Sequence, residues 1–288
     1  MKFYIIIPAH NEEENIGLTL DSLACQTLIP DQLIVVNDNS SDNTKMIVET
    51  FVQKHSWIRL INKKSTEKHL PGAKIIDAFK AGYRELDEHF DVICKFDADI
   101  VFESNYLEKL AKHFKTNPKL GMAAGFCYIK KNNAWVLENL TQKDHIRGAL
   151  KAYKRECFLQ IGKLKSAIGW DTIDELLAQY YQWDILTDET LKVKHLKPTG
   201  QNYSAGAQLL QGVATYRMRL GLVLTLIIGF KMAIKKRKPL LFFDFIKGYF
   251  KAKKEEQTYL VDPKQGKFIR DLRWNGILKK IKFNKEIT

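Results

Sequence analysis

The first half of the chain alternates short apolar runs with segments of helical periodicity. Four runs are almost continuously apolar, as in strands covered on both faces of a sheet: residues 3–7, 32–36, 57–61 and 91–96. Helix-like segments lie between and after these runs, at residues 12–25, 43–55, 73–88 and 104–116. This alternation predicts an α/β domain with a largely parallel central sheet.

Polar residues directly follow three of the four apolar runs. PAHNEE follows the first run, NDNSSD follows the second, and DAD follows the fourth. In sheets of this kind, ligands bind beyond the carboxyl ends of the strands. We therefore expect the three loops to converge on one crevice.

Asp97 and Asp99 are the most informative polar pair. If the strand continues through them, their side chains share one face, and the two carboxylates repel each other unless a cation or a proton is present. Hard divalent cations such as Mg²⁺ and Mn²⁺ are held by one or two carboxylates together with substrate phosphates. The alternative is a turn in which one aspartate caps a helix beginning near Ser104. The position after a buried strand favours a metal site.

The pattern changes after residue 116. A strand near 120–129 and a helix-like segment at 171–181 indicate a second half of the same domain, on the acceptor side. Beyond about residue 205 the composition becomes amphipathic and basic. We therefore predict a catalytic domain at 1–204 and a helical tail at 205–288. Within the domain, we expect a nucleotide half at about 1–116 and an acceptor half at about 117–204.

Most of the net charge lies near the C-terminus. Residues 231–288 contain 17 Lys and Arg against 6 Asp and Glu, a net charge of +11 out of +13 for the chain. Lysine clusters alternate there with apolar stretches at 220–230 and 240–250, a pattern typical of helices that lie on anionic membrane surfaces. Packing of these helices on the catalytic body, with solvated lysines, is the alternative. No RNA- or DNA-binding motif accompanies the charge, so we expect no nucleic-acid partner.

The expected location is the cytoplasmic side of a membrane, as a peripheral protein. The longest apolar run, Leu220–Phe230, has eleven residues, whereas a spanning helix needs about 20. The N-terminal apolar stretch is too short for a signal peptide. The four cysteines show no metal-binding spacing, which suits a reducing cytosol.

Taken together, the three loop motifs resemble those of the family 2 glycosyltransferases, inverting enzymes of the GT-A fold. The family motifs P-x-x-N-E-E, V-V-D-D-G-S-x-D-x-T and D-A-D correspond to residues 8–13, 35–44 and 97–99. Asn39 stands in place of a family glycine, and asparagine tolerates the left-handed backbone that glycine adopts. The resemblance covers about residues 1–200 and implies a Rossmann-like sheet with flanking helices.

The resemblance also implies a nucleotide-diphosphate sugar donor, with UDP preferred over GDP. The residues expected to contact it are Pro8, Ala9, His10, Glu12, Asp38 and Asp97. Lys74 lies in a region that often supplies a basic residue to the donor, although a solvated lysine at a helix start is an equal alternative.

The expected metal is Mn²⁺ or Mg²⁺ on the diphosphate. The resemblance assigns it to Asp99. Many GT-A enzymes complete the site with a histidine near the C-terminus, and His195 occupies a suitable position. A purely structural histidine is the alternative.

GWDTIDE, at residues 169–175, resembles the second acidic motif of the family, usually G-E-D. Inverting transfer needs a general base that accepts the proton of the acceptor hydroxyl. Asp171 aligns with the family's base. Asp174 and Glu175 lie three and four residues further on, on the same helical face, and remain alternatives. Simple acidity at a helix start would also explain the motif.

The sequence therefore predicts a metal-dependent inverting glycosyltransferase that acts on a glycan or lipid-linked acceptor in polysaccharide biosynthesis. One alternative is a sugar-phosphate nucleotidyltransferase. Enzymes of that class typically carry a G-x-G-x-R loop after the first strand. PAHNEE contains no glycine. The other alternative is a catalytically degenerate, membrane-bound scaffold, and the retention of Asp97 and Asp99 argues against it.

Overall fold

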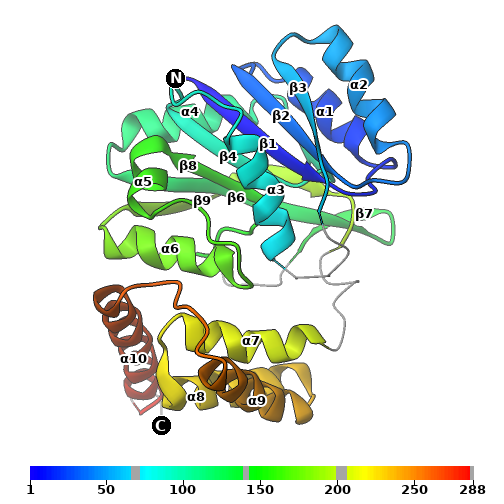
Figure 1. Ribbon diagram of the computed structural model, residues 1–288. Helices are drawn as coiled ribbons and strands as arrows, with labels where there is room; N and C mark the ends of the chain where they lie inside the picture. Colours follow the sequence, from blue (N-terminus) through cyan, green and yellow to red (C-terminus); the bar gives the residue numbers. More distant parts are fainter. Residues whose placement is uncertain (66–71, 139–142, 199–205, 286–288) are drawn as a thin grey trace. The chain divides into compact units, whose positions relative to one another are not determined.

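The computed structural model of the protein describes residues 1–65, 72–138, 143–198 and 206–285 (Figure 1). The chain forms two compact units. One comprises residues 1–166 and 170–201, and the other comprises 167–169 and 202–288. The predicted boundary between residues 204 and 205 lies outside the described residues.

The first unit is built on one central sheet with helices packed on it (Figure 1). Its strands are β1 (Phe3–Ala9), β2 (Gln32–Asp38), β3 (Ile58–Lys63), β4 (Val92–Phe96), β5 (Ile100–Phe102), β6 (Leu120–Lys131), β7 (Ala134–Leu137), β8 (Leu150–Lys154) and β9 (Asp184–His195). Its helices are α1 (Ile16–Ala24), α2 (Thr44–Lys54), α3 (Ala73–Tyr83), α4 (Tyr106–Thr116), α5 (Arg155–Gln160) and α6 (Trp170–Tyr180).

The strand order is β3-β2-β1-β4-β8-β6-β9-β5, and β7 pairs with β6. The four strands from β3 to β4 are mutually parallel, with Ile5 opposite both Leu33 and Cys94. Beyond β4 the sheet is mixed, because β8 runs antiparallel to both β4 and β6. The predicted α/β architecture is confirmed, and its parallel part comprises β1, β2, β3 and β4.

Continuous burial explains why β1, β2 and β4 read as apolar runs. Every residue of β1 and β4 is buried, as are all but the first residue of β2. Strands covered on both faces need apolar side chains at every position and not at alternate ones. Lys95 is the exception in β4, and its side chain is only 1% exposed.

Several element boundaries differ from those expected. β4 ends at Phe96, and residues 97–99 form a turn before β5, so the assumption that the strand continues through Asp97 and Asp99 was wrong. Neither aspartate caps α4, because that helix begins at Tyr106 with Asn105 as its N-cap. α3 ends at Tyr83, five residues earlier than predicted.

β6 and β9 are longer than the pattern suggested. Each has 12 residues, and the two strands pair in parallel with two register irregularities. His195 is the last residue of β9. Pairing of β9 with β5 sets His195 opposite Ile100, next to the turn that carries Asp99.

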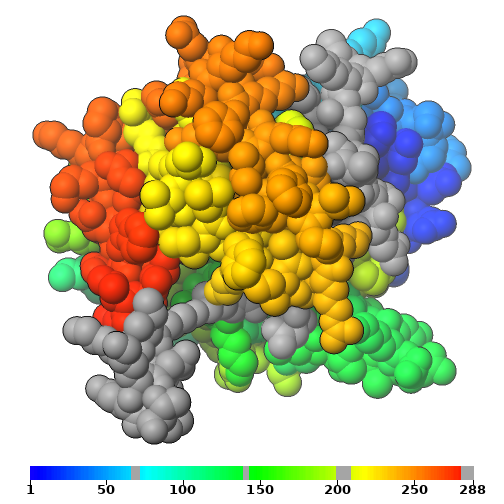
Figure 2. All heavy atoms as spheres, turned by 90° about the horizontal axis from the view of Figure 1, so that it is seen from below, coloured from blue at the N-terminus to red at the C-terminus, as the bar shows by residue number. Residues whose placement is uncertain are grey.

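The second unit is helical and contains α7 (Gly206–Arg217), α8 (Gly221–Lys236), α9 (Leu240–Lys254) and α10 (Pro263–Lys285). The predicted C-terminal helices are thus present, and α7, α8 and α9 lie side by side, yellow to orange in Figure 2. Glycines allow α7 and α9 to approach closely, because a Cβ at Gly248 would lie 2.0 Å from the Leu209 carbonyl oxygen. No helix among the described residues combines the length and the apolarity needed to cross a membrane.

Candidate active site

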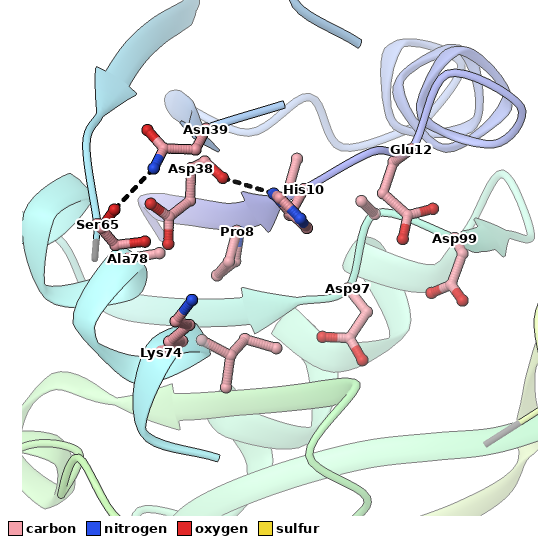
Figure 3. A pocket seen from close by; sticks show the side chains of 13 residues that line it. Pro8, His10, Glu12, Asp38, Asn39, Ser65, Lys74, Ala78, Asp97 and Asp99 are labelled. Carbon is pink, nitrogen blue, oxygen red and sulfur yellow. Dashed lines mark hydrogen bonds between the residues drawn. The ribbon is translucent and has the colours of Figure 1, made fainter. Parts of the chain in front are cut away.

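A pocket of about 630 Å³ opens at the carboxyl ends of β1, β2 and β4 (Figure 3). Its lining combines the loops after these strands with the start of α3. The lining residues are Pro8, Ala9, His10, Glu12, Asp38, Asn39, Ser65, Lys74, Ile75, Ala78, Asp97, Ala98 and Asp99. The structure thus brings together every residue predicted to bind the donor, together with Asp99. Their contact with a ligand stays a prediction.

The loops after β1 and β2 are joined by hydrogen bonds across the pocket wall. The Nδ1 atom of His10 lies 2.7 Å from the backbone oxygen of Asp38. Asn39 adopts a left-handed backbone with φ of 56°, as its place in the motif required, and its side-chain amide donates to the Ser65 carbonyl at 2.7 Å (Figure 3). These bonds hold the wall in place without a ligand.

Cations flank the acidic wall of the pocket. The Lys63 ammonium lies 3.4 Å from the Asp38 carboxylate. Lys74 lies in the first turn of α3, and Figure 3 shows its ammonium directed into the pocket. This orientation favours a donor-binding role for Lys74 over that of a freely solvated lysine.

Lys197, which sequence reasoning missed, contacts Glu12. Its ammonium donates to the Glu12 carboxylate at 2.7 Å. Burial raises the pKa of Glu12, and the Lys197 ammonium opposes this shift. Lys197 follows His195 by two residues, and that proximity is the one signal that could have identified it.

Asp97 is charge-balanced from inside the sheet. Lys95, at the core of β4, is ion-paired with the Asp97 carboxylate and also donates to the Gly148 carbonyl at 3.0 Å. A buried ammonium needs such a partner, because burial of an unpaired charge is costly. Lys95 was not predicted as a site residue, although a lysine inside an otherwise apolar run was a visible signal.

Asp99 and His195 contact each other as the metal prediction requires. The Nε2 atom of His195 lies 3.3 Å from a carboxylate oxygen of Asp99. The Leu196 amide also donates to the Asp99 carbonyl at 2.9 Å. Burial disfavours charge on His195, but the carboxylates of Asp99 and Glu138 outweigh burial and raise the pKa of His195 to about 9.

Glu138 is a third site residue that the sequence analysis did not identify. Its carboxylate lies 2.7 Å from Nδ1 of His195 and is also ion-paired with Arg147. Cys127, Glu138 and His195 have possible ligand atoms within 4.8 Å of one another. Burial raises the pKa of the Cys127 thiol to about 12, so this sulfur keeps its proton.

The three candidate bases lie in the first half of α6 but in different surroundings. The Asp171 side chain is 35% exposed, and it does not line the pocket. Asp174 and Glu175 are buried, and both accept from the Lys151 ammonium, at 2.8 and 3.1 Å. The Tyr153 hydroxyl donates to Asp174 as well. Burial raises the pKa of Asp174 to about 6 despite the attraction of Lys151.

His145 bridges two of these carboxylates. Its Nδ1 atom lies 2.9 Å from Glu175, and its Nε2 atom lies 3.9 Å from Asp171. Burial disfavours charge on the imidazole, but Glu175 and Asp171 outweigh burial and the repulsion of Lys151, so the pKa of His145 is raised.

The sequence profile "Glycosyl transferase family 2" matches residues 4–164. The MG025 homolog of Mycoplasma pneumoniae, named an uncharacterized glycosyltransferase, is 28% identical over 180 residues, which cover 58% of this chain and 57% of that protein. The probable glycosyltransferase YdaM of Bacillus subtilis is 36% identical over 126 residues, 43% of this chain and 29% of its own. The match therefore spans little more than half of the first relative and under a third of the second.

Two solved structures share the fold at low sequence identity. The mannosyltransferase PcManGT of Pyrobaculum calidifontis, in complex with GDP-Man and Mn²⁺, has a TM-score of 0.57 and 14% identity, covering 96% of this chain and 80% of its own. TarS residues 1–349 of S. aureus, in complex with UDP-GlcNAc, also has a TM-score of 0.57, with 16% identity, covering 87% of this chain and 73% of its own. These likenesses support the predicted GT-A fold.

Proposed function

Because the chain belongs to glycosyl transferase family 2, we propose that it is a glycosyltransferase that moves a sugar from a nucleotide-diphosphate sugar to an acceptor hydroxyl with inversion. The observation that carries this proposal is that residues from all three loop motifs line one shared pocket at the carboxyl ends of three strands. Family membership argues against the nucleotidyltransferase alternative. The ion pairing of Asp97 with Lys95 and the contact of Asp99 with His195 argue against a degenerate scaffold.

The residues of the pocket suit the parts of such a donor. Pro8, Ala9, His10 and Asp38 would border the base and ribose, since they line the pocket beyond β1 and β2. Lys74 would attract the negatively charged diphosphate. The two related structures hold a GDP sugar and a UDP sugar respectively, and we propose UDP as the preferred nucleotide.

Asp99 and His195 fit a divalent cation such as Mn²⁺ or Mg²⁺. One carboxylate oxygen and one imidazole nitrogen face each other at 3.3 Å, and two protein ligands leave further positions for water and phosphate oxygens. When bound, the cation supplies positive charge that stabilises the leaving diphosphate. The carboxylates of Asp99 and Glu138 on the two sides of the imidazole support this assignment, because nearby negative charge favours a bound cation.

Asp171 is the proposed general base. In a single displacement the acceptor oxygen attacks the anomeric carbon, the bond to the diphosphate breaks, and the base accepts the hydroxyl proton. Asp171 is partly exposed, so it can meet an acceptor. Asp174 and Glu175 are engaged with Lys151 and buried, which supports Asp171 over both.

The second unit is proposed to bind an anionic membrane surface, where a lipid-linked or glycan acceptor would be met. α8 exposes an apolar stripe with helical spacing, formed by Val223, Ile227, Phe230 and Ile234. α9 exposes Leu240, Phe243 and Phe250. Lys231, Lys235 and Lys236 are exposed on the same helix, and basic side chains together with exposed apolar ones suit a surface of anionic lipids.

A ligand screen tests the proposed donor. Melting temperatures of the full chain are measured with UDP, GDP and their sugar conjugates, each with and without Mn²⁺. A ligand that binds only the native state raises the melting temperature by mass action. The proposal expects a nucleotide-diphosphate sugar to stabilise the protein and Mn²⁺ to increase that effect. Failure of every nucleotide to stabilise the chain would contradict it.

A further inference from the structure

Glu138 occupies a buried position behind the proposed metal ligands. It follows β7, and only 3% of its side chain is exposed. Its backbone amide donates to the Cys127 carbonyl at 2.9 Å, which ties it to β6. A buried carboxylate must be compensated, and Glu138 is compensated from two sides, by Arg147 and by His195.

The contact between Glu138 and His195 determines which imidazole nitrogen can bind a metal. Nδ1 lies 2.7 Å from the Glu138 carboxylate, whereas Nε2 faces Asp99 at 3.3 Å. An ionised carboxylate only accepts hydrogen bonds, so Nδ1 must carry the proton of this bond. Neutral imidazole then has its lone pair on Nε2, on the side of Asp99.

We propose that Glu138 is a positioning residue that fixes His195 in the Nδ1–H tautomer and directs its Nε2 lone pair toward a divalent cation shared with Asp99. The proposal rests on the proposed function, since it requires Asp99 and His195 to hold that cation. Metal-binding histidines commonly donate their second N–H to a carboxylate, which fixes the ring and increases its basicity.

Arg147 completes the arrangement. Its guanidinium pairs with Glu138 and compensates the charge of this buried carboxylate. Glu138 therefore accepts from His195 without adding an uncompensated negative charge beside Asp99. The order is Arg147, Glu138, His195 and Asp99, with each residue contacting the next.

A different use of the same residues would be direct metal binding by Cys127, Glu138 and His195. The geometry favours positioning, because the Nδ1 atom that would have to bind such a metal is already bonded to Glu138.

Mn²⁺ affinity of the full chain tests the proposal, measured by electron paramagnetic resonance of free Mn²⁺ with UDP or GDP present. Glu138→Gln should weaken Mn²⁺ binding about 10- to 100-fold, the range typical of residues that orient metal ligands. His195→Gln should weaken it at least as much. Glu189→Gln, which removes an exposed carboxylate paired with Lys143, is the matched control and should bind Mn²⁺ as the wild type does.

Imidazole NMR with Mg²⁺ supplies a readout that is independent of activity. The wild type should show His195 as the Nδ1–H tautomer, and Glu138→Gln should show a mixture of tautomers. Melting temperature and nucleotide binding without metal establish that each variant is folded.

Each remaining outcome overturns a specific claim. Equal Mn²⁺ affinity of Glu138→Gln and Glu189→Gln refutes the positioning role and leaves the proposed function intact. A larger loss in Glu138→Gln than in His195→Gln makes Glu138 a direct ligand, and sensitivity to Cys127→Ser supports the three-residue site. If the wild type binds nucleotide but no Mn²⁺, the metal assignment itself fails, and the positioning role with it.

Discussion

The ammonium of Lys95 lies 5.4 Å from the centre of a Trp170 ring, while the same ammonium is ion-paired with Asp97. Lys151 contacts Trp170 from another position, at 5.7 Å, and its ammonium donates to the Asp171 carbonyl at 2.5 Å. Trp170, which replaces the usual glutamate of the acidic motif, thus links the turn after β4 to the start of α6. Trp170 therefore contacts the lysine that pairs with Asp97 and itself directly precedes Asp171, so the proposed donor-binding and base residues are both packed near the same buried ring.

Asp99→Asn should remove metal-dependent transfer. The amide keeps the size of the side chain but loses the charge that faces His195, so activity should fall at least about 100-fold. Transfer assays over a Mn²⁺ titration measure this loss. If excess chelator leaves the turnover of both the wild type and Asp99→Asn unchanged, metal dependence is refuted.

Asp171→Asn should lower kcat about 10²- to 10⁴-fold, because an amide cannot accept the hydroxyl proton. The KM for the donor should change little, since Asp171 does not line the pocket. Steady-state kinetics with saturating acceptor separates the two effects. Asp174→Asn is the comparison, and full activity of Asp171→Asn would transfer the role to another carboxylate.

Lys151→Met should destabilise the fold by about 3–5 kcal/mol, because it leaves the buried carboxylates of Asp174 and Glu175 without their cation. Urea denaturation of the full chain measures the free energy of unfolding. Lys143→Met, which breaks an exposed pair with Glu189, should cost no more than about 1 kcal/mol. Similar losses in the two variants would contradict the structural role of this buried group.

His145 should make stability fall as the pH rises. Its folded pKa is raised above 6.5 by Glu175 and Asp171 against burial and Lys151. The resulting stabilisation is complete below pH 6.5 and is lost as the pH rises through the folded value. His195 contributes in the same direction, so melting temperatures of His145→Gln and wild type are compared over this range. The variant should show the smaller decline, and parallel curves would exclude a contribution from His145.

Phe230→Ser combined with Ile234→Ser should weaken binding to vesicles of anionic phospholipid without changing soluble-donor hydrolysis. The two side chains are 60% and 62% exposed, so their loss removes apolar contact with a lipid surface and little core packing. Vesicle co-sedimentation with anionic and neutral lipids measures the effect. Met46→Ser, at a 58% exposed site on α2, is the control. Unchanged sedimentation of the double variant would refute the membrane surface.

Local patterns predicted much of the catalytic unit. Continuous apolar runs marked β1, β2 and β4, because strands buried on both faces are apolar at nearly every position. The loop motifs marked most of the pocket lining, since the carboxyl ends of parallel strands meet at one edge. Asn39 was correctly expected to tolerate a left-handed backbone.

Contacts between distant segments escaped prediction. Glu138 and His195 are 57 residues apart, and Lys197 and Glu12 are 185 apart. A glutamate at the end of an edge strand has no local signature of its role, because its partner depends on how β6, β8 and β9 pair. The turn at Asp97–Asp99 was interpreted as strand for the same reason. It separates β4 from β5, and β5 pairs with the distant strand β9, which the local sequence does not reveal.

The sequence by itself determined the family, the parallel arrangement of short buried strands, and many of the residues around the pocket. These follow from periodicity and from motifs a few residues long. Only the tertiary structure decided which cation balances each carboxylate: Lys95 for Asp97, His195 for Asp99, and Lys151 for Asp174 and Glu175. Charge pairing acts over a few ångströms in space, and only the folded sheet brings these partners within that distance.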